Sequence, residues 1–172
     1  DACAAIVDAE GFHAVTIDDV ATACGVSRTV VYQQFGGLDG MLDALVERSA
    51  ARAAAAFAAT DVAQGPLTLR TAMERVLEAV DADPATWRMF LVAPQVGPPA
   101  LAENLATGRA MLRDQSVAAI ESRTQRPLDD PELTARMLQA VTDELVRLRL
   151  ADPVEFSEQR ILAAVDRLGD AL

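Results

Sequence analysis

The sequence predicts an all-α fold, and three observations support this prediction. Apolar residues recur at helical spacing along most of the 172 residues, whereas no segment shows the alternation of apolar and polar residues that is typical of a strand. Alanine and leucine are abundant, and aromatic residues make up only 4% of the chain. Proline, glycine and aspartate fall between the periodic segments, where helices begin and end.

Taken in order, the periodic segments predict about nine helices. The first three end near residues 10, 24 and 35. The later helices are expected at 38–59, 67–82, 87–92, 101–123, 132–150 and 154–168. We expect two domains, which cover residues 1–46 and 47–172. No apolar run approaches the roughly 20 residues of a membrane-spanning helix, and no signal peptide is visible, so we expect a cytoplasmic protein.

The segment from Thr16 to Leu42 predicts two short helices joined by a tight turn. Thr16 is an N-cap residue type, and an acid follows three residues later, close to a capping box. An apolar stripe at i, i+3, i+4 and i+7 spacing would bury one face of the first helix; it consists of Ile17, Val20, Ala21 and Cys24. Gly25 stands where a helix ends in a left-handed backbone conformation.

The second helix of this segment is expected to begin after Ser27, another N-cap residue type. Val31 and Phe35 would face inward, with Tyr32 at the edge of the outer face. The outer face would carry Arg28, Thr29, Val30 and Gln33. Arginine can bind guanine, glutamine can bind adenine, and threonine or valine can contact a thymine methyl group in the major groove. The segment therefore predicts a DNA-binding helix-turn-helix.

These residues also resemble a known family. Residues 11–21 have the sequence GFHAVTIDDVA, residues 25–35 have the sequence GVSRTVVYQQF, and a glycine-rich step leads into the next helix. This pattern resembles the TetR/AcrR family of transcriptional regulators. The resemblance implies an all-α homodimer with an N-terminal three-helix DNA-binding unit and a helical domain for ligand binding and dimerisation. It implies repression of transcription and release from DNA when a small molecule binds.

The resemblance assigns base contacts to Arg28, Thr29, Val30 and Gln33, and phosphate contacts to Thr16 and Tyr32. The chain departs from the family pattern at Leu38, where a lysine is usual, and at Gln34, where a histidine is frequent. Loss of that lysine should weaken DNA binding. The backbone N–H groups of Gly37 and Leu38 can still meet a phosphate at a helix N-terminus.

Net charge is the main argument against DNA binding. The 15 basic residues are all arginine, and the net charge is −11. Residues 1–48 hold eight acids and only Arg28 and Arg48 as bases, a formal charge of −6, whereas DNA-binding domains usually carry a basic patch. We expect weak non-specific affinity, and we expect a basic arm to precede Asp1. The alternatives are a homologue that binds a ligand or a protein but not DNA, and an activator.

A pocket for an apolar or weakly acidic effector is expected among the central helices. Pockets are mostly apolar with few polar anchors, and methionine side chains adapt to varied shapes. The alternative is that the same residues are ordinary core. The candidates are Phe57, Met73, Leu77, Trp87, Phe90, Leu91, Met111 and Met137.

The last two helices are the predicted dimer interface, because they carry more apolar surface than a lone edge helix needs. Paired with their symmetry mates they would form a four-helix bundle. The alternative is that they pack only within the chain. The interface candidates are Leu138, Val141, Leu145, Leu148, Ile161, Leu162, Val165 and Leu168.

The sequence offers no constellation for catalysis, and we expect no enzyme activity, cofactor or metal. His13 is the only histidine, and we expect it in an exposed turn. Cys3 and Cys24 both lie on predicted core faces and are expected to be buried thiols in a reducing compartment. The expected partners are therefore an operator DNA, a second copy of the chain and a small molecule whose identity the sequence does not specify.

Overall fold

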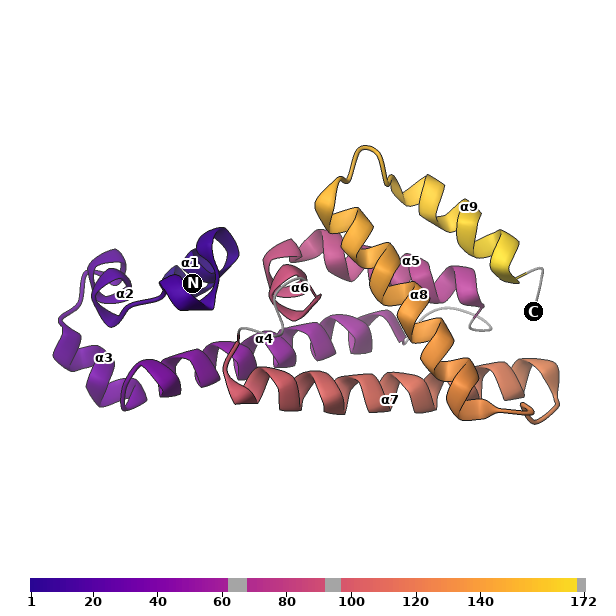
Figure 1. Ribbon diagram of the computed structural model, residues 1–172, viewed down its shortest axis with the longest axis horizontal. Helices are drawn as coiled ribbons and strands as arrows, with labels where there is room; N and C mark the ends of the chain where they lie inside the picture. The colour runs from indigo at the N-terminus through magenta and orange to yellow at the C-terminus, as the bar shows by residue number, and fades with distance from the viewer. Residues whose placement is uncertain (62–67, 92–96, 170–172) are drawn as a thin grey trace. The chain divides into compact units, whose positions relative to one another are not determined.

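The described helices confirm the all-α prediction. The computed structural model of the chain describes residues 1–61, 68–91 and 97–169, with the side chains of all of these except 56–61. These residues form nine α-helices and one 3-10 turn, and none of them is in a strand (Figure 1). The elements are α1 (Ala2–Glu10), η1 (Phe12–Ala14), α2 (Ile17–Cys24), α3 (Arg28–Phe35), α4 (Leu38–Asp61), α5 (Leu69–Ala82), α6 (Pro84–Leu91), α7 (Pro99–Thr124), α8 (Pro131–Ala151) and α9 (Glu158–Gly169).

The predicted start of the last helix at residue 154 was wrong, because α9 begins at Glu158. The carboxylate of Asp152 accepts hydrogen bonds from the backbone N–H groups of Val154 at 3.1 Å and Glu155 at 2.9 Å. An aspartate that binds the backbone in this way stabilises a turn and competes with helix formation. Val154 in this turn is 87% exposed.

The described chain forms two compact units. Unit 1 draws on Asp1–Ala55 and Pro84–Leu105, and unit 2 draws on Ala56–Asp83 and Ala106–Leu172. Unit 1 therefore combines the N-terminal helices with α6 and the first turns of α7. The domain boundary expected at residue 46 places α6 and α7 in the other domain. None of the described helices is long and apolar enough to cross a membrane.

Helix α1 of unit 1 packs against α6. The two helices are joined by Arg88, whose Nε and Nη2 atoms donate hydrogen bonds to the two carboxylate oxygens of Asp8 at 2.6 and 2.8 Å. The hydrogen bonds from Arg88 lower the pKa of Asp8, and those to Asp8 raise the pKa of Arg88. Cys3 is also buried in α1, and its burial raises the pKa of its thiol.

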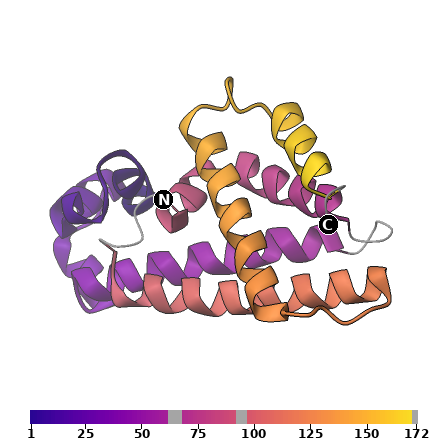
Figure 2. The ribbon, with the colours of Figure 1, turned by 45° about the vertical axis from the view of Figure 1, so that its right-hand side comes forward.

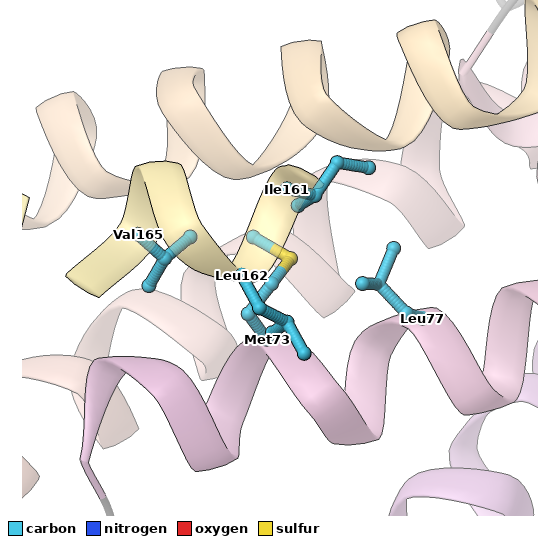
Figure 3. Packing of buried hydrophobic residues seen from close by; sticks show 5 residues of the cluster. All are labelled: Met73, Leu77, Ile161, Leu162 and Val165. Atoms are coloured by element: carbon cyan, nitrogen blue, oxygen red, sulfur yellow. The ribbon is translucent and has the colours of Figure 1, made fainter. Parts of the chain in front are cut away.

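Unit 2 is built around the packing of α5 on α9. Its core cluster consists of two residues from α5 and three from α9 (Figure 3), namely Met73, Leu77, Ile161, Leu162 and Val165. Helix α8 also packs on α5, and Figure 2 shows these three helices from a second direction. Arg149 of α8 donates hydrogen bonds to both carboxylate oxygens of Asp81 at 2.7 and 3.0 Å, and these bonds raise the pKa of Arg149.

Candidate DNA-binding site

Helix α2 has the boundaries that the sequence predicts, because both of its end signals operate. The hydroxyl of Thr16 accepts the N–H of Asp19 at 3.1 Å and donates to the Asp19 carboxylate at 2.5 Å. Gly25 has φ 67° and ψ 29°, the left-handed conformation expected of a C-terminal glycine. The N–H of Val26 then returns to the carbonyl of Ala21 at 3.0 Å. This cap fixes where the chain turns toward α3.

Helix α3 follows from Arg28 to Phe35 and presents a polar outer surface. Ser27 occupies the N-cap position, although its side chain makes no capping hydrogen bond. Val31 is buried with 4% exposure and anchors the helix, which packs on α2. The residues predicted to contact DNA bases are all exposed, as is Tyr32 at 54%; they are Arg28, Thr29, Val30 and Gln33.

Two apolar side chains of this region are more exposed than the sequence predicts, and a third is exposed as well. Phe35 was expected to face inward but is 38% exposed. Val26, in the turn between α2 and α3, is 41% exposed. Cys24 was expected on a core face but is also exposed. The reason is that α2 and α3 have only eight residues each, so the area over which they contact one another is small. Val31 near the middle of α3 is buried, whereas residues at the ends of the two helices stay exposed.

The turn between α3 and α4 depends on glycines. Gly36 and Gly37 have φ angles of 76° and 150°, in the region that favours glycine. A Cβ atom on Gly37 would lie 3.9 Å from the Cε1 atom of Tyr32, so this backbone lies beside the tyrosine ring. Leu38 is half-buried at the start of α4. The predicted phosphate contacts thus come from the start of α2, the middle of α3 and this turn.

Gly40 is a further residue on which this site depends, and it is not among the residues that the sequence motif predicts. A Cβ atom on Gly40 would clash with the carbonyl oxygen of Phe35. The first turn of α4 can therefore approach the end of α3 only because residue 40 has no side chain. A glycine one turn into a helix was the available signal, since glycine there is unfavourable without a packing reason.

The two arginines of residues 1–48 are both paired with acids. The guanidinium of Arg28 forms a two-pronged ion pair with the carboxylate of Asp18 in α2. Arg48 lies 3.5 Å from the carboxylate of Asp1. Both pairs are solvent-exposed. The surface that carries the predicted DNA contacts consequently has little free positive charge.

The predicted effector-pocket residues are distributed over both units. Met73 and Leu77 belong to the core of unit 2, where they contact α9, and Phe90 and Leu91 are buried in unit 1. Trp87 is half-buried. Met111 and Met137 are exposed by 52% and 62%, so they are not enclosed within the chain. Phe57 lies outside the described side chains.

A cavity of about 400 Å³ in unit 1 lies elsewhere, between η1, the start of α4 and the start of α7. None of the seven predicted pocket residues whose side chains are described lines it. His13, exposed in η1 as the sequence predicts, contributes to its wall. The other lining residues are Phe12, Asp39, Leu42, Asp43, Gly97, Pro98 and Pro99.

The predicted dimer-interface residues fall into two groups. Ile161, Leu162 and Val165 are buried against α5 with 2 to 6% exposure. Their apolar face is therefore already covered by the chain itself, as in the alternative that the sequence left open. The remaining five residues are partly or fully accessible: Leu138, Leu145 and Leu148 are half-buried, and Val141 and Leu168 are exposed.

Comparisons with known proteins agree with this arrangement. Residues 1–45 match the family described as "Bacterial regulatory proteins, tetR family". A comparison with curated proteins gave no match.

Solved structures match the chain over nearly its full length. A TetR-like transcriptional regulator from Rhodococcus sp. RHA1 is 24% identical with a TM-score of 0.80, covering 98% of this chain and 90% of that chain. A second Rhodococcus sp. protein of the TetR family is 26% identical with a TM-score of 0.64, covering 98% and 94%. The ketosteroid transcriptional regulator KstR2 of Mycobacterium tuberculosis is 22% identical with a TM-score of 0.66, covering 95% and 89%.

The fold and the site together define an all-helical protein with an N-terminal helix-turn-helix. Its residues 1–45 match the tetR family of bacterial regulatory proteins, and its fold over nearly the full length is similar to that of TetR-like transcriptional regulators.

Proposed function

We propose that the protein is a repressor that binds a palindromic operator as a homodimer and leaves it when a small, largely apolar effector binds. The observation that carries the proposal is the exposed outer face of α3, where Arg28, Thr29, Val30 and Gln33 combine donors for bases with contacts for thymine methyl groups. Two such helices about 34 Å apart would bind successive major grooves.

Dimerisation is supported by apolar residues that unit 2 leaves accessible on its last two helices. On α8, Leu133, Met137 and Val141 recur every four residues and are exposed by 54%, 62% and 36%. Leu168 of α9 is 41% exposed. A second copy would remove these side chains from water, and the apolar area that it covers stabilises association.

An apolar effector is supported by two arginines of unit 2 that already donate hydrogen bonds within the chain. Arg109 and Arg113 of α7 donate hydrogen bonds to Asp143 and Gln139 of α8, each at 2.9 Å. These donors are therefore already engaged with the chain. The Nε atom of Arg109 is buried and has no hydrogen-bond partner among the described residues, which leaves one donor for a polar group on the effector. The likeness to a ketosteroid regulator agrees with a ligand that is mostly apolar.

Release would follow from differential affinity. An effector that binds one arrangement of the two DNA-binding units better than the other shifts the dimer off its operator, by no more than that difference in affinity. The alternative is a homologue that binds a ligand or a protein but not DNA. It is favoured by one observation, the pairing of both arginines of residues 1–48 with acids.

The test is a binding titration of the full chain with DNA, at low and moderate salt. The probes are the region upstream of its own gene and a duplex selected by the protein from a random pool. We expect saturable binding that Arg28→Ala and Tyr32→Phe weaken. Arg160→Ala, which removes one exposed arginine from α9 in unit 2, is the matched control and should bind as the wild type does. If the wild type selects no sequence even at low salt, DNA binding is refuted and the alternative replaces it.

A further inference from the structure

Arg28 is the only basic residue between Thr16 and Leu42, and its charge is not free. Its Nε atom faces one carboxylate oxygen of Asp18, and its Nη2 atom faces the other. Asp18 lies in the first turn of α2, ten residues earlier in the chain. The helix that would enter the major groove is thus tied through its first residue to the helix before it.

The ion pair uses one edge of the guanidinium and leaves the other groups available. Arginine has five N–H donors, and two of them face Asp18. The donors that the pair does not use include the Nη1 end, which can still form a two-pronged contact with the O6 and N7 atoms of guanine. Because Asp18 binds one edge of the guanidinium, Arg28 can form this contact with guanine only in a narrow range of side-chain orientations.

The same pair removes the attraction that would hold Arg28 to any phosphate. The arginine and aspartate side chains are 68% and 49% exposed, so both charges are accessible to an approaching duplex. Asp19 adds a second negative charge in the same turn of α2. Arg28 therefore adds little affinity for a duplex that lacks the correct base. Its positive charge is already balanced by Asp18, so it neutralises no phosphate and releases no counterion there.

We infer that Asp18 is a specificity-determining residue, which holds Arg28 in an orientation that binds guanine and suppresses its binding to phosphates of arbitrary sequence. The inference rests on the proposed function, because it concerns the same DNA-binding surface. It assigns to an acid on the binding face a role in selecting the operator, in addition to the role of its charge at a helix N-terminus.

Asp18→Asn tests the inference, and Asp19→Asn is its matched control. Both substitutions remove one negative charge from the first turn of α2, but the Asp19 carboxylate accepts a hydrogen bond from Thr16 at 2.5 Å and is not the partner of Arg28. The probes are the duplex that the wild type selects from a random pool and a scrambled duplex of the same composition. The dissociation constants of both are measured at several salt concentrations.

We expect Asp18→Asn to tighten binding of the scrambled duplex and to steepen its salt dependence by about one released counterion per protomer. The ratio of specific to scrambled affinity should fall by about fivefold or more, the lower end of what one two-pronged base contact contributes. Asp19→Asn should leave this ratio unchanged. In an Arg28→Ala background, Asp18→Asn should also leave it unchanged.

The outcomes separate this inference from the proposed function. If the wild type selects a sequence but both aspartate variants change the ratio equally, only the general charge matters and the role of Asp18 is refuted. An Asp18→Asn ratio equal to that of the wild type refutes it as well. If the wild type selects no sequence, the proposed function and the inference fail together. Circular dichroism of each variant checks that the helices are retained.

Discussion

The ion pair between Asp8 and Arg88 should contribute measurably to the stability of unit 1. A double-mutant cycle tests this, in which the free energy of unfolding is measured for the wild type, Asp8→Ala, Arg88→Ala and the double variant. The cycle cancels the packing that each side chain loses by itself and isolates the coupling of the pair.

The magnitude follows from the geometry and exposure of the pair. Two charge-assisted hydrogen bonds of 2.6 and 2.8 Å join the side chains, which are 26% exposed for Asp8 and 39% for Arg88. Exposed pairs contribute about 0.2–1 kcal/mol, and two-pronged geometry strengthens a pair. Because solvent still reaches both groups, we expect a coupling of about 1 kcal/mol near pH 7.

The coupling should depend on pH with a defined sign. The folded state lowers the pKa of Asp8 because Arg88 donates hydrogen bonds to its carboxylate. A carboxyl group with a lowered folded pKa stabilises the folded state above its unfolded pKa, and that contribution is lost as the pH falls through the folded value. We therefore expect the full coupling above about pH 5 and a progressive loss below about pH 4.

The assay is urea unfolding followed by far-UV circular dichroism and by the fluorescence of Trp87, the only tryptophan and the neighbour of Arg88 in α6. The control cycle uses Glu132 and Arg136, an i,i+4 pair on α8 that is exposed by 75% and 60%. Its coupling should stay below about 0.5 kcal/mol. Equal couplings for the two pairs, or an Asp8–Arg88 coupling that is as large at pH 3 as at pH 7, would refute the reasoning.

Two substitutions, each with a matched control, test packing. Gly40→Ala should destabilise the protein by about 1–3 kcal/mol, because the new methyl group meets the Phe35 carbonyl. Its control is Gly108→Ala in α7, where a Cβ meets nothing within 4 Å, and this substitution should stabilise the protein by up to about 1 kcal/mol. Thermal unfolding distinguishes the two outcomes. Leu77→Ala should cost about 2–5 kcal/mol in urea unfolding, because Leu77 is 1% exposed. Leu112→Ala, at a site 39% exposed, should cost less than about 1 kcal/mol, and a similar loss for both leucines would contradict the packing described.

Sequence reasoning succeeded where the signal is local. Thr16 caps α2 through its own hydroxyl, and Gly25 takes the left-handed conformation that ends the helix. Such features depend on a few neighbouring residues, so the sequence contains the information. The same applies to Val31, whose place in the apolar pattern predicts its burial.

The failures concern features that only distant contacts decide. An apolar stripe on a helix predicts that a face is covered, but it does not name the covering element. Ile161 and Leu162 were therefore predicted to meet a second chain, whereas α5 covers them. Cys24 fits the stripe of α2 but lies at its uncovered end. A glycine in the first turn of a helix, such as Gly40, indicates a packing constraint, but the pattern does not name the Phe35 carbonyl as the group that a Cβ atom would meet.

The shared core of α5 and α9 has a thermodynamic consequence. Met73 and Leu77, predicted for the effector pocket, and Ile161 and Leu162, predicted for the dimer, are parts of one cluster. If the proposed effector separates α5 from α9, it displaces one of them, and α9 carries the exposed Leu168 of the proposed dimer surface. In the proposed dimer, a displacement of α9 would link effector binding to subunit association, and each would then change the equilibrium constant of the other by the same factor. The apparent affinity for the effector would accordingly vary with the concentration of the protein itself.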